Sequence, residues 1–231
     1  MAKGTTQDYE IEIKSLLGTA EAADKLRTDL KKIDPTSTRI SSYTQINHYF
    51  EGGNPHTLAT HLAPHLAPEH AEKMHQIAKE GKNISVRSRE MNREVRMVMK
   101  ASIGDDSSAN GVMRMEIEAP VIEFTTLEQL DAVVLGADYT YQAKWSRTRE
   151  EYRVKDVTVC LDKNAGYGYL AEFEKVIDDA TQAEEAKKEL VSLMEMLNVS
   201  ELPQDRLERM FSFYNEHWPE YYGTEKIFIV E

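Results

Sequence analysis

Charged and apolar residues alternate with a period of two in at least five separate stretches of the sequence. In residues 9–14, two glutamates and a lysine alternate with a tyrosine and two isoleucines. Because successive side chains of a strand point to opposite faces, each stretch predicts a strand with one charged and one apolar face. One such strand is typical of a solvated sheet edge, whereas five indicate a shared polar interior with helices packed outside. The charged positions in the other stretches are Arg87 and Arg89, Arg114, Glu116 and Glu118, Arg147 and Arg149, and Glu172 and Glu174.

Eight strands are predicted, and most of them follow one another too closely for parallel crossovers. Their short connections favour an antiparallel sheet, and closure of the sheet removes its exposed edges. Helical spacing of apolar residues predicts helices at 20–33, at 127–134, from 181 onward and after Pro203, while 226–230 is a candidate last edge strand. The predicted strands are 8–17, 40–50, 83–90, 93–102, 112–122, 139–150, 153–161 and 169–177.

These elements predict an α+β fold, a closed eight-stranded antiparallel β-barrel with flanking helices and a helical C-terminal extension. A chain of 231 residues is long enough for one such domain. We expect a single domain over residues 1–231, with the barrel at about 8–177 and the C-terminal helices at about 181–216.

Residues 54–82 form a predicted insertion between the second and third strands. The segment carries five of the seven histidines, and Pro64 and Pro68 are expected to interrupt its helices. His61 and His65 have the i, i+4 spacing of a helical metal site, but the prolines and the lack of carboxylate partners disfavour one. We expect a solvated insertion that binds no metal.

Composition limits the partners and the compartment. A net charge of −12 disfavours nucleic acid, so an anion site needs a local concentration of arginine and lysine. No apolar run reaches the roughly 18 residues of a membrane span, and the polar start lacks a secretion signal, so we expect a cytoplasmic protein. The single Cys160 cannot form an internal disulfide and is expected to be a buried packing thiol.

The charged positions have the donor types of a metal and phosphate site. Glutamates from the first and last strands would form an oxygen cage for Mg²⁺ or Mn²⁺, which prefer oxygen ligands. No cluster of thiols or imidazoles competes for this role. Arginines bind phosphate oxygens bidentately and stay charged when desolvated, so the combination indicates phosphate chemistry. The proposed cage consists of Glu10, Glu12, Glu172 and Glu174.

An ordered series of motifs runs from the first predicted strand to the last. The motifs are Glu10-x-Glu12-x-Lys14, Arg87-x-Arg89, Lys100, Arg114-x-Glu116, Arg147-x-Arg149-x-x-Tyr152, Leu161-Asp162 and Gly168-x-x-x-Glu172-x-Glu174. The first motif alone occurs by chance, but its place on the first strand and the ordered series after it are specific. With these motifs, residues 9–177 resemble the CYTH family, the triphosphate tunnel metalloenzymes. The resemblance implies an eight-stranded antiparallel barrel around a tunnel, in which triphosphates react with Mg²⁺ or Mn²⁺.

The resemblance also implies roles for individual residues. It makes Lys14, Glu10 and Glu12 catalytic. It implies that the metal ligands are Glu10, Glu12, Glu172 and Glu174, with Glu116 and Asp162 near the metals. It implies that the triphosphate is held by Lys14, Arg87, Arg89, Lys100, Arg114, Arg147 and Arg149.

Three functions are compatible with these residues. Members of the family include thiamine triphosphatases, inorganic tripolyphosphatases, RNA 5′-triphosphatases and class IV adenylyl cyclases. The leading hypothesis is hydrolysis of inorganic tripolyphosphate or of a nucleoside or thiamine triphosphate, by a monomer or a homodimer. The alternatives are a class IV adenylyl cyclase, which makes cyclic AMP and pyrophosphate from ATP, and a polyphosphate-binding module without turnover. The long segment 54–82 disfavours a compact cyclase, and four carboxylates buried without a metal disfavour a pure anion binder.

Overall fold

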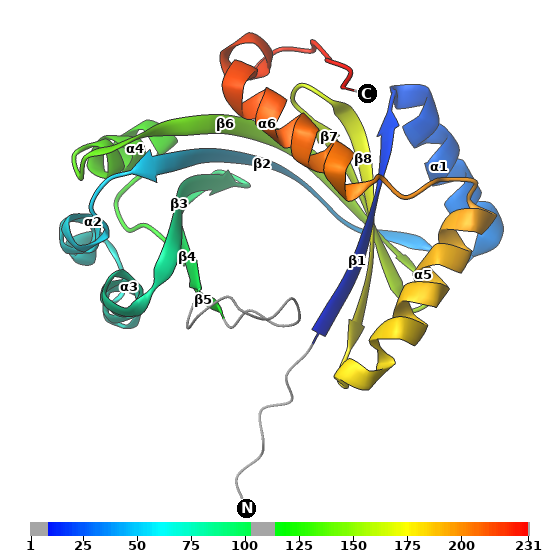
Figure 1. Ribbon diagram of the computed structural model, residues 1–231, viewed down its shortest axis with the longest axis horizontal. Helices are drawn as coiled ribbons and strands as arrows, with labels where there is room; N and C mark the ends of the chain where they lie inside the picture. Colours follow the sequence, from blue (N-terminus) through cyan, green and yellow to red (C-terminus); the bar gives the residue numbers. More distant parts are fainter. Residues whose placement is uncertain (1–8, 103–113, 231) are drawn as a thin grey trace, which may run out of the picture. The chain divides into compact units, whose positions relative to one another are not determined.

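The fold is described by a computed structural model that covers residues 9–102 and 114–230, without the side chains of Tyr9, Glu10, Arg114 and Ala180. Eight strands form an antiparallel sheet in the order β1-β8-β7-β6-β2-β3-β4-β5 (Figure 1). The strands are β1 (Tyr9–Gly18), β2 (Thr38–Gly52), β3 (Lys82–Met91), β4 (Glu94–Ser102), β5 (Arg114–Pro120), β6 (Tyr139–Val154), β7 (Val157–Asn164) and β8 (Gly168–Ile177). The helices are α1 (Ala20–Ile33), α2 (Pro55–Leu62), α3 (Pro68–Glu80), α4 (Leu127–Leu135), α5 (Ala183–Met196) and α6 (Gln204–Tyr221), with 3-10 turns η1 (Ala63–His65) and η2 (Ala180–Gln182). None of the helices in the described ranges has the length and apolarity needed to cross a membrane.

The eight predicted strands are confirmed, but their closure into a barrel is not. Within residues 9–102 and 114–230, no hydrogen-bonded ladder joins β1 to β5, the two ends of the strand order. The prediction of a last edge strand at 226–230 is wrong, because Ile227 forms an isolated parallel bridge with Gly166. Gly166 lies in the turn between β7 and β8, and both edges of each of these strands are already paired within the sheet. The C-terminal segment therefore has no strand edge there to extend along.

The chain separates into two compact units, each with its own apolar core. The first unit comprises Met1–Tyr43 and Arg147–Glu231, and the second comprises Thr44–Ser146. Strands β2 and β6 each contribute residues to both units.

The first unit buries the apolar faces of β1, β7 and β8 under α1 and α5. Ile13 and Phe173 pack in one cluster with Leu26 and Leu30 of α1 and Leu190 of α5. The i, i+4 spacing of the two α1 leucines puts both on the face turned toward the sheet. Their burial confirms the predicted helix at 20–33 and the prediction that helices cover the apolar side of these strands.

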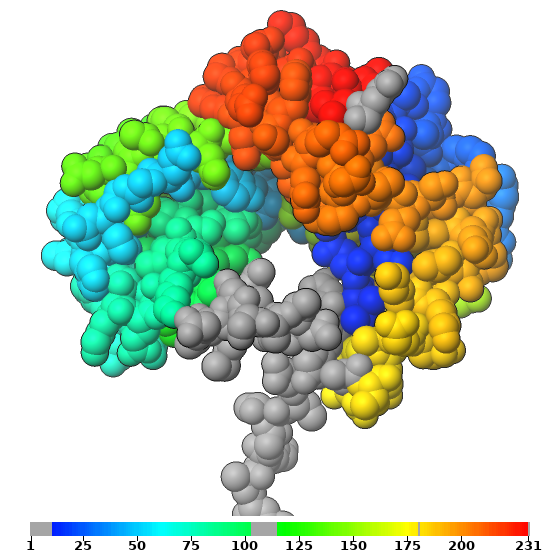
Figure 2. All heavy atoms as spheres, in the orientation of Figure 1, coloured from blue at the N-terminus to red at the C-terminus, as the bar shows by residue number. Residues whose placement is uncertain are grey.

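The second unit uses the predicted insertion as part of its core, so the prediction of a solvated insertion is wrong. Leu58 and Leu62 of α2 and Met74 and Ile77 of α3 are fully buried, in one cluster with apolar residues of β3, β4 and β5. Pro68 does not break a helix but begins one, because the first helical position needs no N–H donor. The exposed residues of this segment, such as Thr60 and His61, belong to the surface that is cyan to turquoise in Figure 2. The predicted interruption of the helices at Pro64 and Pro68 is confirmed, because α2 ends at Leu62, Pro64 lies in η1 and α3 begins only at Pro68.

Leu62→Ala is expected to lower the free energy of unfolding by about 3 kcal/mol, because it opens a cavity in a fully buried part of the core. Urea denaturation followed by circular dichroism measures the loss. His61→Ala, at the exposed neighbouring position of α2, is the matched control and should stay within about 0.5 kcal/mol of the wild type. Equal stability of the two variants would contradict a core role for the insertion.

Candidate functional site

The side of the first unit's sheet that points away from α1 and α5 carries most of the predicted site. The strand register places Lys14 opposite Glu172, Glu172 opposite Cys160, and Cys160 opposite Glu151. Neighbouring strands are about 4.8 Å apart, so these side chains stand in a row across four strands. We call this surface the carboxylate face; it consists of Glu12, Lys14, Arg147, Arg149, Glu151, Cys160, Asp162, Glu172 and Glu174.

Arg149 is the central cation of the carboxylate face. Its Nε and Nη2 donate to the two oxygens of Asp162, each at 2.7 Å, and Nη2 also donates to Glu172. Nη1 lies 3.9 Å from Glu174 Oε1. Asp162, 1% exposed, accepts a further hydrogen bond from Arg147 Nη1 at 3.0 Å. The carboxylate predicted to lie near a metal therefore holds two guanidinium groups in place.

Burial and charge act in opposite directions on the ionisation of these groups. Burial alone raises the pKa of Glu172, but the charges of Arg149, Lys14 and Arg147 outweigh it and hold the pKa below its usual value. Burial alone lowers the pKa of Arg149, but Asp162 and Glu172 outweigh it and raise that pKa. Both groups therefore stay charged at neutral pH, although each is 8% exposed.

Lys14 joins β1 to this cluster. Its ammonium forms an ion pair with Glu12 and lies 3.6 Å from Glu172 Oε1. Glu12 is exposed, whereas Glu172 is buried, so Lys14 connects the solvent side of the face to its interior. The side chain of Glu10, the other predicted ligand on β1, lies outside the described residues.

Cys160 is buried, as predicted, and it also belongs to the carboxylate face. Its Sγ donates to Glu174 Oε1 at 3.6 Å, and its donor atom and those of Glu172 and Glu174 all lie within 4.8 Å of one another. Burial raises the pKa of the thiol, so it remains protonated. The signal was present in the sequence, because Cys160 has the same strand parity as Asp162, two residues further on.

A second group missed from the sequence lies beside this row. The hydroxyl of Tyr43 on β2 donates to Glu151 Oε1 at 2.9 Å. Burial, followed by the hydrogen bond to Glu151, raises the pKa of Tyr43 to about 12, so the phenol keeps its proton. Strand parity places Glu151 with Arg147 and Arg149, but the register that brings it opposite Cys160 could not be read from the sequence.

The second unit carries a separate charged surface on the side of its sheet away from α2, α3 and α4. Arg89 Nε donates to Asn47 at 2.8 Å, and its Nη1 donates to Glu118 at 2.5 Å. Lys100 lies 2.8 Å from Glu116, so that predicted metal neighbour is paired with a lysine in this unit. The side chain of Arg114 lies outside the described residues. We call this surface the arginine face; it consists of Asn47, Tyr49, Arg87, Arg89, Arg96, Lys100, Glu116 and Glu118.

Arg87 on the arginine face has an unsatisfied donor. Its Nη1 donates to the hydroxyl of Tyr49 at 3.0 Å, and its guanidinium lies 4.7 Å from the centre of that ring. Its Nε is buried and has no hydrogen-bond partner in the part of the chain that is described. A buried unsatisfied donor costs about 1–3 kcal/mol, so this position favours an incoming acceptor such as a phosphate oxygen.

A buried polar network lies behind the arginine face and supports β3. Asp131 of α4 accepts hydrogen bonds from Ser88 Oγ at 2.6 Å and from Tyr141 Oη at 2.7 Å, and it lies 2.6 Å from His48 Nδ1. Ser88 stands between the two β3 arginines in sequence and points to the opposite face. Burial alone raises the pKa of Asp131, but these hydrogen bonds outweigh it and lower the pKa below its usual value. The network fixes the strand that carries both arginines.

Asp131→Asn is expected to lower the free energy of unfolding by about 2 kcal/mol at pH 7, because a buried charge-assisted network is lost. A carboxylate with a lowered folded-state pKa stabilises above its unfolded pKa of about 3.9 and loses this effect as the pH falls through the folded value. The difference between variant and wild type should therefore shrink below about pH 4 in urea titrations. A difference that stays constant with pH would contradict a role for the carboxylate charge.

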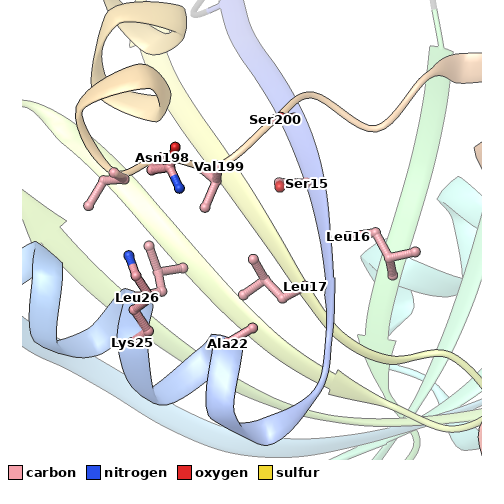
Figure 3. A pocket seen from close by; sticks show the side chains of 10 residues that line it. Ser15, Leu16, Leu17, Ala22, Lys25, Leu26, Asn198, Val199 and Ser200 are labelled. Atoms are coloured by element: carbon pink, nitrogen blue, oxygen red, sulfur yellow. The ribbon is translucent and has the colours of Figure 1, made fainter.

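The pocket in Figure 3 lies elsewhere in the first unit, beside β1, the start of α1 and the residues after α5. It has a volume of about 280 Å³, and its walls include Leu17, Leu26 and Val199. Lys25, the charged residue among its lining side chains, is paired with Asp29 at 2.5 Å. The lining contains no carboxylate, imidazole or thiol, so this pocket is not the metal site.

Known proteins resemble this chain in sequence family and in fold. The CYTH domain model matches residues 71–206, more than half of the chain, although β1 lies outside this match. The fold is similar to that of a "putative adenylate cyclase" from Vibrio parahaemolyticus, with a TM-score of 0.53, 15% identity, and coverage of 88% of this chain and 98% of that one. A conserved hypothetical protein from Pyrococcus furiosus gives a TM-score of 0.52 at 17% identity, with coverage of 83% and 92%. Among curated proteins, no sequence matches significantly. The match over residues 71–206 shows that the chain belongs to the CYTH domain family.

Proposed function

We propose that this protein hydrolyses the terminal phosphoanhydride bond of a triphosphate, with Mg²⁺ or Mn²⁺ as cofactor. The observation that carries the proposal is the carboxylate face, on which acids and bases interleave at ion-pair distances. A site that binds only an anion would not be stabilised by buried carboxylates. A site that binds only a metal would not need the three cations Lys14, Arg147 and Arg149 beside those carboxylates. Membership in the CYTH family supports the same reading.

The acids of this face fit a hard divalent cation. Glu172 and Glu174 bring oxygens together, and Glu12 lies opposite Glu174 in the strand register. Such oxygen donors suit Mg²⁺ and Mn²⁺, while the protonated thiol of Cys160 does not. We assign the cofactor to Glu12, Glu172 and Glu174, together with Glu10 as the sequence predicts. When bound, such a cation neutralises phosphate oxygens and lowers the pKa of a coordinated water.

The positively charged side chains of this face would then bind and orient the substrate. Lys14 and Arg147 carry the multiple N–H donors that suit phosphate oxygens, three on a lysine and five on an arginine. Most of the N–H donors of Arg149 are used in hydrogen bonds to Asp162 and Glu172. We therefore assign to Arg149 the role of fixing the carboxylates, and to Lys14 and Arg147 that of holding the phosphate chain against the attacking water. The reaction forms a bond from the terminal phosphorus to the water oxygen and breaks the bond from that phosphorus to its bridging oxygen. The diphosphate leaves with the bridging oxygen, inorganic phosphate is released, and the proton of the water passes to the solvent.

The proposal includes the predicted closure of the sheet into a barrel. In each unit, the residues of the carboxylate face or of the arginine face lie on the side of the strands away from the apolar core under the helices. A barrel would turn both sides inward, so that Arg87, Arg89 and Lys100 act on the same triphosphate as Lys14. Support for closure comes from the family and from this common parity.

Arg87→Ala is expected to raise the KM for tripolyphosphate about tenfold or more, with a smaller change in kcat, because it removes a charge-assisted hydrogen bond to the substrate. Steady-state kinetics measure both constants. Lys73→Ala removes one positive charge from exposed α3 and serves as the control. An Arg87→Ala variant with the wild-type KM would contradict the joint action of the two faces.

A substrate panel tests the function directly. Tripolyphosphate, thiamine triphosphate, ATP and GTP are incubated with Mg²⁺ or Mn²⁺, and phosphate, pyrophosphate and cyclic AMP are quantified. Release of phosphate supports hydrolysis. Cyclic AMP with pyrophosphate would replace the proposal by a class IV cyclase, and tight binding of tripolyphosphate without product would replace it by a binding module.

A further inference from the structure

We propose that the carboxylate face also contains an inhibitory site for thiophilic divalent cations such as Zn²⁺ and Cd²⁺. Its ligands are the Sγ of Cys160 and the carboxylates of Glu172 and Glu174. The inference rests on the proposed function in one respect, because the same two carboxylates are assigned to the hard cofactor. It adds a ligand of a different chemical kind, which distinguishes soft cations from Mg²⁺.

The geometry brings sulfur and oxygen donors together on two paired strands. Cys160 on β7 lies directly opposite Glu172 on β8, and its Sγ is 3.6 Å from Glu174 Oε1. One donor atom from each of the three residues lies within 4.8 Å of the others. The 3.6 Å distance from Sγ to Glu174 Oε1 is close to the separation of two ligand atoms on a common metal, since Zn–S and Zn–O bonds are about 2.3 and 2.1 Å long.

The surrounding core holds these donors in place. Val159 and Leu161, the neighbours of Cys160 in sequence, and Phe173, between the two glutamates, are at most 2% exposed in the core under α1 and α5. Because the apolar neighbours fix the strands, the thiol and the carboxylates must point to the opposite face. The three ligands of the site therefore lie on the paired strands β7 and β8 and not on a loop.

The donor set selects soft cations over hard ones. Mg²⁺ takes oxygen ligands, whereas Zn²⁺ and Cd²⁺ accept thiolate sulfur together with carboxylate oxygen. On binding, a metal–sulfur bond forms, the S–H bond breaks and the proton is released to the solvent. Two carboxylates and one thiolate then surround the cation and leave one coordination position open. Each carboxylate has two oxygens, so Arg149 and Lys14 can keep part of their contacts. A soft cation held in this way occupies the oxygens that the cofactor needs.

The chain offers an unambiguous spectroscopic test, because Cys160 is its only cysteine. The metal-free protein is titrated with Cd²⁺ in the absence of substrate, and the ultraviolet charge-transfer band of a cadmium thiolate is recorded. We expect the band to saturate at a single equivalent in the wild type and to be absent in Cys160→Ser. Glu174→Gln keeps the thiol and should weaken Cd²⁺ binding about tenfold or more, since one of three ligands is lost.

Inhibition gives the second readout. The Zn²⁺ concentration that halves the Mg²⁺-supported rate should rise about tenfold or more in Cys160→Ser, with each variant compared with its own rate without Zn²⁺. Equal Zn²⁺ sensitivity of both proteins would overturn the proposal, since Zn²⁺ would then act elsewhere, for example at the histidines of α2 and α3. Lack of a Cd²⁺ band, or unchanged Cd²⁺ affinity in Glu174→Gln, would overturn the three-ligand site. If the Cd²⁺ band appears as expected but the protein hydrolyses no triphosphate, the result supports this site and overturns the proposed function.

Discussion

Replacement of Glu172 by Gln is expected to lower kcat/KM for the best triphosphate substrate about 10³-fold, with the fold retained. The pKa of Glu172 lies below its usual value, so the wild-type residue carries its charge throughout the neutral range. Gln keeps the shape but removes the charge that would hold the cofactor, and losses of 10²–10³-fold are typical when one preorganised electrostatic group is removed. Arg149 keeps both hydrogen bonds to Asp162, so the guanidinium stays paired and the stability of the fold should change little. Steady-state kinetics with saturating Mg²⁺, together with a thermal melt, measure both effects.

Glu150→Gln is the matched control for this prediction. Glu150 is on the same sheet but on the opposite side, where it accepts two hydrogen bonds from Arg27 of α1 at 3.0 and 2.9 Å. The substitution is chemically identical and removes an ion pair of comparable geometry, so it costs some stability but should leave the catalytic constants unchanged. Similar activity losses in both variants would show that the effect of Glu172 is structural. Wild-type activity of Glu172→Gln would remove this residue from the cofactor site.

The side on which each charged residue lies could be predicted from the sequence, because strand parity is a local property. A period of two alone predicts one side for Glu12, Lys14, Glu172 and Glu174 and the other side for Ile13. The structure confirms this division, since Ile13 is 5% exposed in the core under the helices. Apolar residues at i, i+4 on the intervening helices made the covering layer equally predictable.

Partners across strands could not be predicted in the same way, because they depend on register and not on parity. Nothing in the sequence sets Cys160 opposite Glu172 or Glu151 opposite Cys160, so the proximity of the thiol to these carboxylates is not predictable. Register also places Asp162 beside Arg149, from which it accepts two hydrogen bonds, while its place near a metal stays a prediction.

The insertion shows a different limit. The prolines of residues 54–82 can end a helix or begin one, and only the tertiary structure distinguishes the two. Leu58, Leu62, Met74 and Ile77 cover the apolar side of β3, β4 and β5. Without this segment that side would be exposed, so the segment completes the core of the second unit and is not an addition to it.

Arg149→Met is expected to lower the free energy of unfolding by about 4 kcal/mol at pH 7, the largest stability loss among the variants considered. Its side chain is 10% exposed, and those of its partners Asp162 and Glu172 are 2% and 11% exposed. Removing one partner of a buried ion pair typically costs 3–5 kcal/mol, because the remaining charge stays buried without compensation. Arg147 and Lys14 retain one contact each to these carboxylates and offset only part of the loss.

The pH dependence of Arg149→Met distinguishes lost charge compensation from lost packing. In the wild type, the lowered pKa of Glu172 stabilises the fold above its unfolded pKa of about 4.3, and this effect is lost as the pH falls through the lower folded value. Without Arg149, burial raises the pKa of the same carboxyl group. The Glu172 carboxylate of the variant therefore takes up a proton on acidification, and the fold no longer contains an uncompensated buried charge. The deficit relative to wild type should therefore shrink between pH 7 and pH 4 in urea titrations. Arg153→Met, an exposed position on the same side of β6, should cost no more than about 0.5 kcal/mol at either pH. A deficit that is independent of pH would mean that Arg149 stabilises the face through its packed side chain and not through its charge.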